Sequence, residues 1–135
     1  MAEYGRRGAR RMLLQALYQY QIGGHERADI AAQFGDQAAY GQIDTDYFQS
    51  MLTEVINSIP ELDARIAAVA DRPVEQLDPV EHAVLWIGLA ELTCRDDVPH
   101  RVAINEAVEL AKQFGAQDSY RYVNAILDSV VGERR

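Results

Sequence analysis

Four arginines near the start of the chain are the densest set of residues that could do chemistry. Arg6 and Arg10 are four residues apart and therefore share one face of a helix. Arg7 and Arg11 form a second pair with the same spacing. Guanidinium groups make paired hydrogen bonds with phosphate oxygens, so the cluster suits a phosphate backbone; the alternative is a solvated, solubilising segment. Gly8 weakens a helix locally, which predicts that the first two arginines lie on a mobile lead-in.

The charge of the whole chain has the opposite sign. The chain carries 21 acidic and 13 basic residues, a formal net charge of -8. Taken alone, this balance argues against nucleic-acid binding, because polyanions repel each other. The first eleven residues, however, hold four arginines and a single acidic residue, so the acidic excess lies in the rest of the chain. The sequence thus predicts an acidic body with a compact basic edge.

Aromatic residues beside a basic residue supply a second candidate for binding. Tyr120 and Tyr122 flank Arg121, and Tyr18 lies off the main apolar stripe of its predicted helix. An exposed tyrosine beside an arginine can stack on a base of single-stranded RNA while the arginine pairs with a phosphate. The alternative for any one tyrosine is a ring packed at the edge of the core with its hydroxyl exposed.

Three acidic residues, Glu75, Asp78 and Glu81, form a third candidate feature. Asp78 precedes Pro79 at a predicted helix start, so capping explains part of this acidity, with Glu81 reaching back to the cap amide. The same residues could dock a basic partner through charge complementarity.

Nothing in the sequence predicts catalysis or a metal site. His25, His82 and His100 form no metal-binding pattern, and Cys94 with His100 lacks a third ligand. Cys94 is the single cysteine, and we expect it to be a small buried residue near a helix end. The chain also lacks a nucleophile elbow, a phosphate-binding loop and a dinucleotide-binding glycine motif. We therefore predict a binding protein rather than an enzyme, without cofactor or metal.

The elements that must position these residues are all predicted to be helices. Apolar residues recur at helical spacing along nearly the whole chain, and no long stretch alternates as a strand does. Helix starts are marked by Asp44 and by Asp78 before Pro79, and glycines mark several ends. The predicted helices cover about seven ranges: 6–21, 27–34, 45–59, 60–70, 79–96, 102–114 and 118–130.

Length and composition agree with a small all-α protein. The 135 residues are 48% hydrophobic and 25% charged, as in a globular domain large enough to bury a core. The sequence has no run of 18 apolar residues and no signal-peptide pattern, so we expect a cytoplasmic protein without membrane contact. The break near Pro60 predicts an N-terminal helical lobe over 1–59 and a C-terminal lobe over 60–135, which together form a single domain over 1–135.

Six motifs occur in order along the chain and extend over nearly all of it. They are RRGAR at 6–10, QALYQYQ at 15–21, EHAVL at 81–85, DVPHRVAINEAVELAK at 97–112, FGAQDS at 114–119 and YVNAILD at 122–128. Together they resemble the NusB family of transcription antitermination proteins. The resemblance implies two three-helix bundles packed across each other, with a further linking helix. It also implies binding of the boxA element of nascent RNA together with NusE, a small-subunit ribosomal protein, in an RNA polymerase antitermination complex with other Nus factors, notably in rRNA operons.

The resemblance gives individual residues expected roles in RNA binding. It implies that Arg6, Arg7 and Arg10 contact phosphates. It assigns Tyr122 to stacking on a base and places Asp118 at the RNA edge, where its negative charge restrains affinity. An acidic body would then suppress non-specific RNA binding while the basic edge keeps the specific contact.

The resemblance also implies a protein–protein surface. Tyr18, Glu75 and Glu81 match positions that face the ribosomal-protein partner. Family members are expected to vary between monomer and dimer, so the alternative function is a self-associating helical scaffold whose homodimer occludes RNA binding. Trp86 and Ala90 depart from the family pattern, and the sequence gives them no role.

Overall fold

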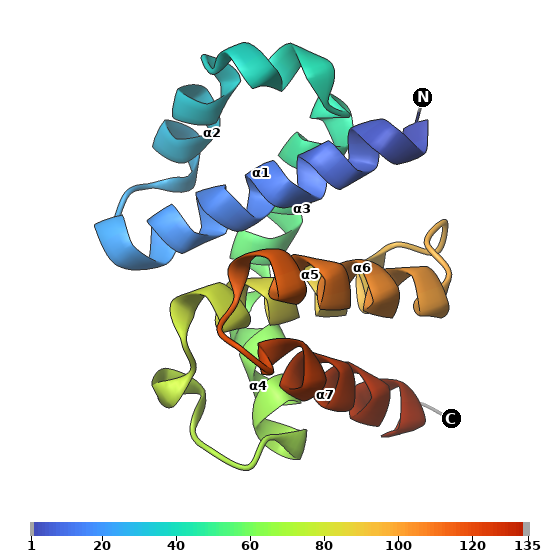
Figure 1. Cartoon of the computed structure of the whole chain (residues 1–135). Coiled ribbons are helices and arrows are strands. Elements are labelled where there is room, and N and C mark those ends of the chain that lie inside the picture. Colours follow the sequence, from blue (N-terminus) through green and yellow to red (C-terminus); the bar gives the residue numbers. More distant parts are fainter. Residues whose placement is uncertain (1, 134–135) are drawn as a thin grey trace. The chain divides into compact units, whose positions relative to one another are not determined.

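The structure is a computed structural model that describes the backbone of residues 2–133 and the side chains of residues 5–132. Over residues 2–133 the chain forms seven α-helices and two short 3-10 helices, and none of these residues lies in a β-strand (Figure 1). The predicted all-α class is therefore confirmed. The elements are α1 (Ala2–Gly23), α2 (Arg27–Gly35), η1 (Ala38–Gln42), α3 (Thr45–Asn57), α4 (Ile59–Val69), η2 (Val74–Gln76), α5 (Pro79–Cys94), α6 (His100–Phe114) and α7 (Ser119–Glu133).

The helices cluster into two compact units, Met1–Asn57 and Ser58–Arg135, called here the N-terminal and C-terminal units. The boundary predicted from the sequence, at the junction before Pro60, lies two residues later. That the two units together form a single domain stays a prediction.

The first helix begins earlier than the sequence predicts. α1 starts at Ala2, so Arg6 and Arg7 lie inside a regular helix, and the predicted lead-in is wrong. The weak point at Gly8 is held by packing: a Cβ at this position would lie 2.7 Å from Ile43 Cγ2. Tertiary contact of this kind outweighs the low helix propensity of one glycine.

In the N-terminal unit, α1, α2 and α3 pack around a shared apolar core. The start of α3 is fixed at Asp44, whose Oδ1 accepts a hydrogen bond of 3.1 Å from the Tyr47 amide, which confirms the predicted cap. The Asp44 amide in turn donates to the Gly5 carbonyl at 3.0 Å. This second bond holds the start of α3 against the first turns of α1, where the arginines lie.

In the C-terminal unit, α5 packs against α4, α6 and α7. Its residues are buried from Glu81 to Leu92, and most of them are apolar, as expected for a helix in the centre of its unit. Gly88 permits this closeness, because a Cβ there would lie 2.8 Å from Leu127 Cδ1 and 3.3 Å from Ala107 Cβ. The predicted cap of α5 is confirmed, since Asp78 accepts hydrogen bonds from the amides of the second and third residues of the helix.

Candidate nucleic-acid interface

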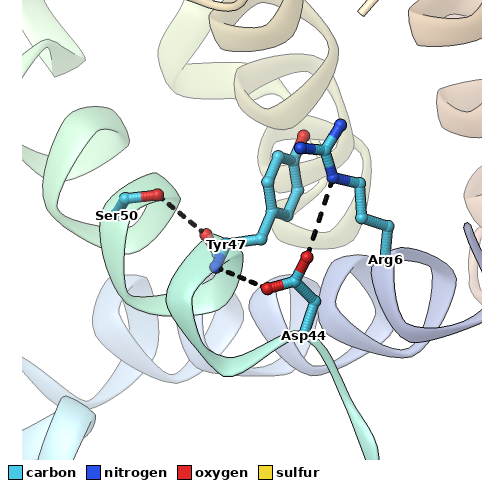
Figure 2. A network of polar contacts seen from close by, with 4 residues as sticks. All are labelled: Arg6, Asp44, Tyr47 and Ser50. Atoms are coloured by element: carbon cyan, nitrogen blue, oxygen red, sulfur yellow. Dashed lines mark hydrogen bonds and ion pairs between the residues drawn. The ribbon is translucent and has the colours of Figure 1, made fainter. Parts of the chain in front are cut away.

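Two of the three arginines predicted to contact phosphate converge on one tyrosine of the N-terminal unit. The Arg6 guanidinium carbon lies 4.4 Å from the centre of the Tyr47 ring, and its Nε lies 3.9 Å from Asp44 Oδ2 (Figure 2). The Arg10 guanidinium carbon lies 5.7 Å from the same ring centre. Tyr47 itself is 2% exposed, and its carbonyl accepts a hydrogen bond from the Ser50 hydroxyl. The ring therefore serves as an internal platform for two cations.

The three arginines differ in their exposure. Arg10 is 4% exposed, which corrects the expectation that it offers its guanidinium to phosphates. Arg6 is half-buried beside Asp44, whereas Arg7 is exposed. Helical spacing places Arg6 and Arg10 on one face, and that face packs against α3. Arg7 is therefore the member of the predicted set that the described surface presents most fully.

Tyr122, the predicted stacking residue, is partly covered by a residue that the sequence analysis did not single out. The Arg72 guanidinium carbon lies 4.3 Å from the centre of the Tyr122 ring, and the Tyr122 hydroxyl oxygen is buried. Burial raises the pKa of the Tyr122 phenol above its ordinary value, although the Arg72 charge opposes this shift. Arg72 also donates from Nε to Asp71 Oδ1 at 3.2 Å, and this bond raises the pKa of the Arg72 guanidinium.

Asp118 lies on the surface beside basic and aromatic side chains. Its Oδ1 is 3.6 Å from Arg121 Nε, and its backbone has a φ of 68° in the left-handed region. Arg121 Nε also donates to the Tyr120 hydroxyl at 3.2 Å, and Lys112 Nζ lies 5.1 Å from the centre of the Tyr120 ring. The negative charge of Asp118 is thus partly balanced by its own neighbour.

The residues predicted to face a protein partner differ in their exposure. Tyr18 is 42% exposed, and Glu75 is exposed as well. Glu81 is 8% exposed, and its Oε2 accepts a hydrogen bond of 2.6 Å from the Ser119 hydroxyl. Glu81 therefore links the start of α5 to the start of α7. This corrects two expectations: that Glu81 lies on an acidic surface, and that its carboxylate accepts a hydrogen bond from the Asp78 amide.

A polar cluster that the sequence analysis missed gives Trp86 a role. Asp63 Oδ1 accepts a hydrogen bond of 2.8 Å from Trp86 Nε1 and lies 2.7 Å from His82 Nε2. His82 and Trp86 are one turn apart on α5, and their ring centres are 4.3 Å apart. The cluster pins α4 to α5. The sequence did contain a signal for this cluster. His82 and Trp86 have rings with polar N atoms, are four residues apart, and follow a predicted helix that contains Asp63.

The described residues show few features of other kinds of site. Cys94 is exposed at the end of α5, which corrects the expectation that it is buried. No group of three or more histidine, cysteine, aspartate or glutamate side chains between residues 5 and 132 could hold a metal ion. None of the helices formed by residues 2–133 has the length and hydropathy needed to cross a bilayer.

Comparison with known proteins places this geometry in a family. The sequence profile of the NusB family matches residues 7–132. The transcription antitermination protein NusB of Alcanivorax borkumensis is 47% identical over 130 residues, which are 96% of this chain and 87% of that protein. The solved structure of T. maritima NusB has a TM-score of 0.85 at 26% identity and covers 95% of this chain and 91% of that one.

A further structural likeness supports the fold alone. One chain in the crystal structure of the antitermination factors NusB and NusE in complex with dsRNA has a TM-score of 0.83 at 22% identity. The match covers 98% of this chain and 99% of that one.

Fold and sequence together define an all-helical transcription antitermination protein. The chain belongs to the NusB family, since the family profile and the curated relative both extend over nearly its whole length. As a member of that family it is an antitermination factor and not an enzyme.

Proposed function

We propose that this protein binds the boxA element of nascent RNA together with NusE, a small-subunit ribosomal protein. The pair would seed a complex with other Nus factors on RNA polymerase in the cytoplasm, notably on rRNA operons. Family membership supports this proposal. The solved complex of the antitermination factors NusB and NusE with dsRNA supports it too, because this chain shares the fold of one chain in that complex. The geometric observation that carries it is the exposure of Arg7 on α1.

Arg7 is the proposed direct phosphate contact of the N-terminal unit. Arg6 and Arg10 support it by holding the helix face against Tyr47 and by adding positive potential along the same helix. This division of roles follows from exposure, since a guanidinium needs to reach the phosphate oxygens to form paired hydrogen bonds.

The C-terminal unit supplies the proposed base contact and an opposing charge. The partly exposed Tyr122 ring can stack on a base that displaces Arg72, whose side chain is substantially exposed. Asp118 restrains RNA affinity, because its carboxylate is exposed at the start of α7.

Tyr18 on the N-terminal unit and Glu75 on the C-terminal unit are the proposed contacts for NusE. Both are exposed in the described surface. An exposed tyrosine ring is a common anchor in protein interfaces, and a carboxylate complements a basic ribosomal protein. Glu81 is not a proposed direct contact, because its side chain is buried and its carboxylate accepts a hydrogen bond from Ser119.

The test is a fluorescence-anisotropy titration of a short boxA-containing RNA at two salt concentrations, with and without NusE. The expected result is weak binding to the protein alone and much tighter binding when NusE is present. An RNA of the same composition in scrambled order is the control and should gain little from NusE. Equal affinity for both RNAs would contradict boxA recognition.

Absence of RNA binding under both conditions would overturn the proposal. If light scattering then showed a molecular mass that rises with protein concentration, the alternative of a self-associating scaffold would replace it. A homodimer that covers the arginines would also weaken RNA binding per protomer as the protein concentration is raised.

A further inference from the structure

A cavity of about 360 Å³ opens in the N-terminal unit between α1 and the η1 region. Its apolar lining includes Met12, which is buried, and Ile43, which is half-buried. The volume lies in the range of small-molecule sites, about 300–1,000 Å³. The polar side chains that line it are Arg11, Gln15, Gln37 and Gln42.

Gly8 lines the same cavity and explains how its wall is built. A Cβ on Gly8 would lie 2.7 Å from Ile43 Cγ2, a distance that real Cβ atoms do not adopt. The absence of a side chain therefore lets the segment around Ile43 approach α1 closely. Gly8, which interrupts the arginine cluster in the sequence, thus helps to form the cavity beside that cluster.

The polar lining is available for a ligand. Within the described part of the chain, the side chains of Arg11, Gln15, Gln37 and Gln42 form no hydrogen bond or ion pair of their own. The lining contains no carboxylate, although the chain has 21 acidic residues. A cation would find no counter-charge here, whereas a ligand with both donors and acceptors would find partners.

A nucleobase is a ligand of this kind, because it combines an apolar face with hydrogen-bond donors and acceptors. Its faces are flat and pack on apolar side chains, and its edge carries both donors and acceptors. Arginine pairs in two-point fashion with the guanine edge, and glutamine does so with the adenine edge. One guanidinium and three amides around an apolar lining therefore favour a purine over a pyrimidine.

The position of the cavity connects it to the proposed RNA contact. Arg11 follows Arg7 by four residues on α1, which is about 6 Å along the helix axis and on the same face. Arg7 is exposed, and Arg11 lines the cavity. A nucleotide whose phosphate is held at Arg7 lies within reach of the cavity with its base.

We propose that the cavity between α1 and η1 binds one purine base of the RNA, turned out from the strand beside the phosphate held at Arg7. This inference rests on the proposed function, because it requires RNA to follow α1. It adds a base contact in the N-terminal unit, where the sequence analysis expected phosphate contacts only.

The experiment uses boxA-containing RNAs in which each purine in turn is replaced by 2-aminopurine. One position should change in fluorescence when the full-length protein and NusE bind, because insertion removes the base from its stack. In Gln42→Ala and in Ala39→Leu, which partly fills the cavity, this change should be lost. Gln113→Ala, an exposed glutamine on α6, is the matched control and should keep it.

Affinity gives a second readout. An abasic site at the responsive position should weaken binding to the wild-type protein about tenfold and should change binding to the Ala39→Leu variant little. Ala39 is exposed, and circular dichroism verifies that the variants fold.

The outcomes separate this inference from the function on which it rests. If RNA binds but no 2-aminopurine position responds, or the response survives in both cavity variants, the base site is refuted and RNA binding stands. If no boxA RNA binds with or without NusE, the proposed function fails and the base site fails with it.

Discussion

Each unit of the molecule sets arginine side chains against a tyrosine ring, but at different depths. In the N-terminal unit, Arg6 and Arg10 approach Tyr47, whose ring is almost fully buried. In the C-terminal unit, Arg72 covers Tyr122, which is half-buried and lies beneath an exposed guanidinium. The first arrangement is part of the core, whereas the second can open to a ligand. An arginine near a tyrosine therefore indicates RNA binding only when the pair lies at the surface.

The largest expected effect of this difference concerns stability in the N-terminal unit. Arg10→Ala removes a buried side chain beside Tyr47 and should lower the free energy of unfolding by about 2 kcal/mol. Arg7→Ala, an exposed position, should change it by less than about 0.5 kcal/mol. Urea titrations followed by circular dichroism measure both values. Equal losses in the two variants would show that Arg10 is not part of the core.

The next effect concerns stacking in the C-terminal unit. Tyr122→Leu should weaken boxA RNA binding about tenfold, since stacking on an aromatic side chain contributes about 1–3 kcal/mol per base. Tyr122→Phe keeps the ring and should bind nearly as the wild-type protein does. Anisotropy titrations in the presence of NusE make the comparison. If the leucine variant binds normally, Arg72 keeps the ring covered and Tyr122 is a structural residue.

A smaller effect is expected from Asp118→Asn, which should tighten RNA binding several-fold. The substitution removes a repelling charge and releases Arg121 from its ion pair. Asparagine tolerates the left-handed φ of 68° at this position, so the fold should be retained. Because salt screens exposed charges, the gain should shrink as the salt concentration rises. Weaker binding in the asparagine variant would instead give the Asp118 carboxylate a structural role.

The smallest effect is on proton binding at Tyr122. Its pKa lies above the ordinary value of about 10 because burial disfavours the phenolate. The resulting contribution to stability is fully present below about pH 10 and is lost as the pH rises through the folded-state pKa. Arg72→Gln keeps much of the side chain over the ring but removes the charge that lowers this pKa, so the pKa should rise further.

An NMR titration of ring-labelled tyrosine follows this pKa in both proteins. A pKa that falls or stays constant in Arg72→Gln would contradict an effect of the Arg72 charge on Tyr122.

What the sequence could predict depends on how far apart the interacting residues are in the chain. The caps at Asp44 and Asp78 act within three residues, and both were correctly predicted. The bond between Glu81 and Ser119 joins positions 38 residues apart, so local spacing did not reveal that Glu81 turns inward. Arg10 is a similar case, because its burial depends on a tyrosine of another helix.

The same reasoning explains the first helix and the missed cluster. Helix propensity predicted a weak start at Gly8, whereas the contact with Ile43 decides the outcome. Asp63 accepts a hydrogen bond from the Trp86 indole N–H but lies on α4, whereas Trp86 lies on α5, so local spacing did not reveal the pair. Helical periodicity therefore yielded the class and nearly all elements, while the orientation of individual polar side chains required the structure.

The measurement that tests the central claim most directly is the salt dependence of boxA RNA binding, in the presence of NusE, for the wild-type protein and Arg7→Ala. If Arg7 holds a phosphate, the variant should bind more weakly, and the slope of log affinity against log salt concentration should fall by about one phosphate contact. An unchanged affinity and slope in Arg7→Ala would contradict the account, because the exposed arginine of α1 would then lie outside the RNA interface.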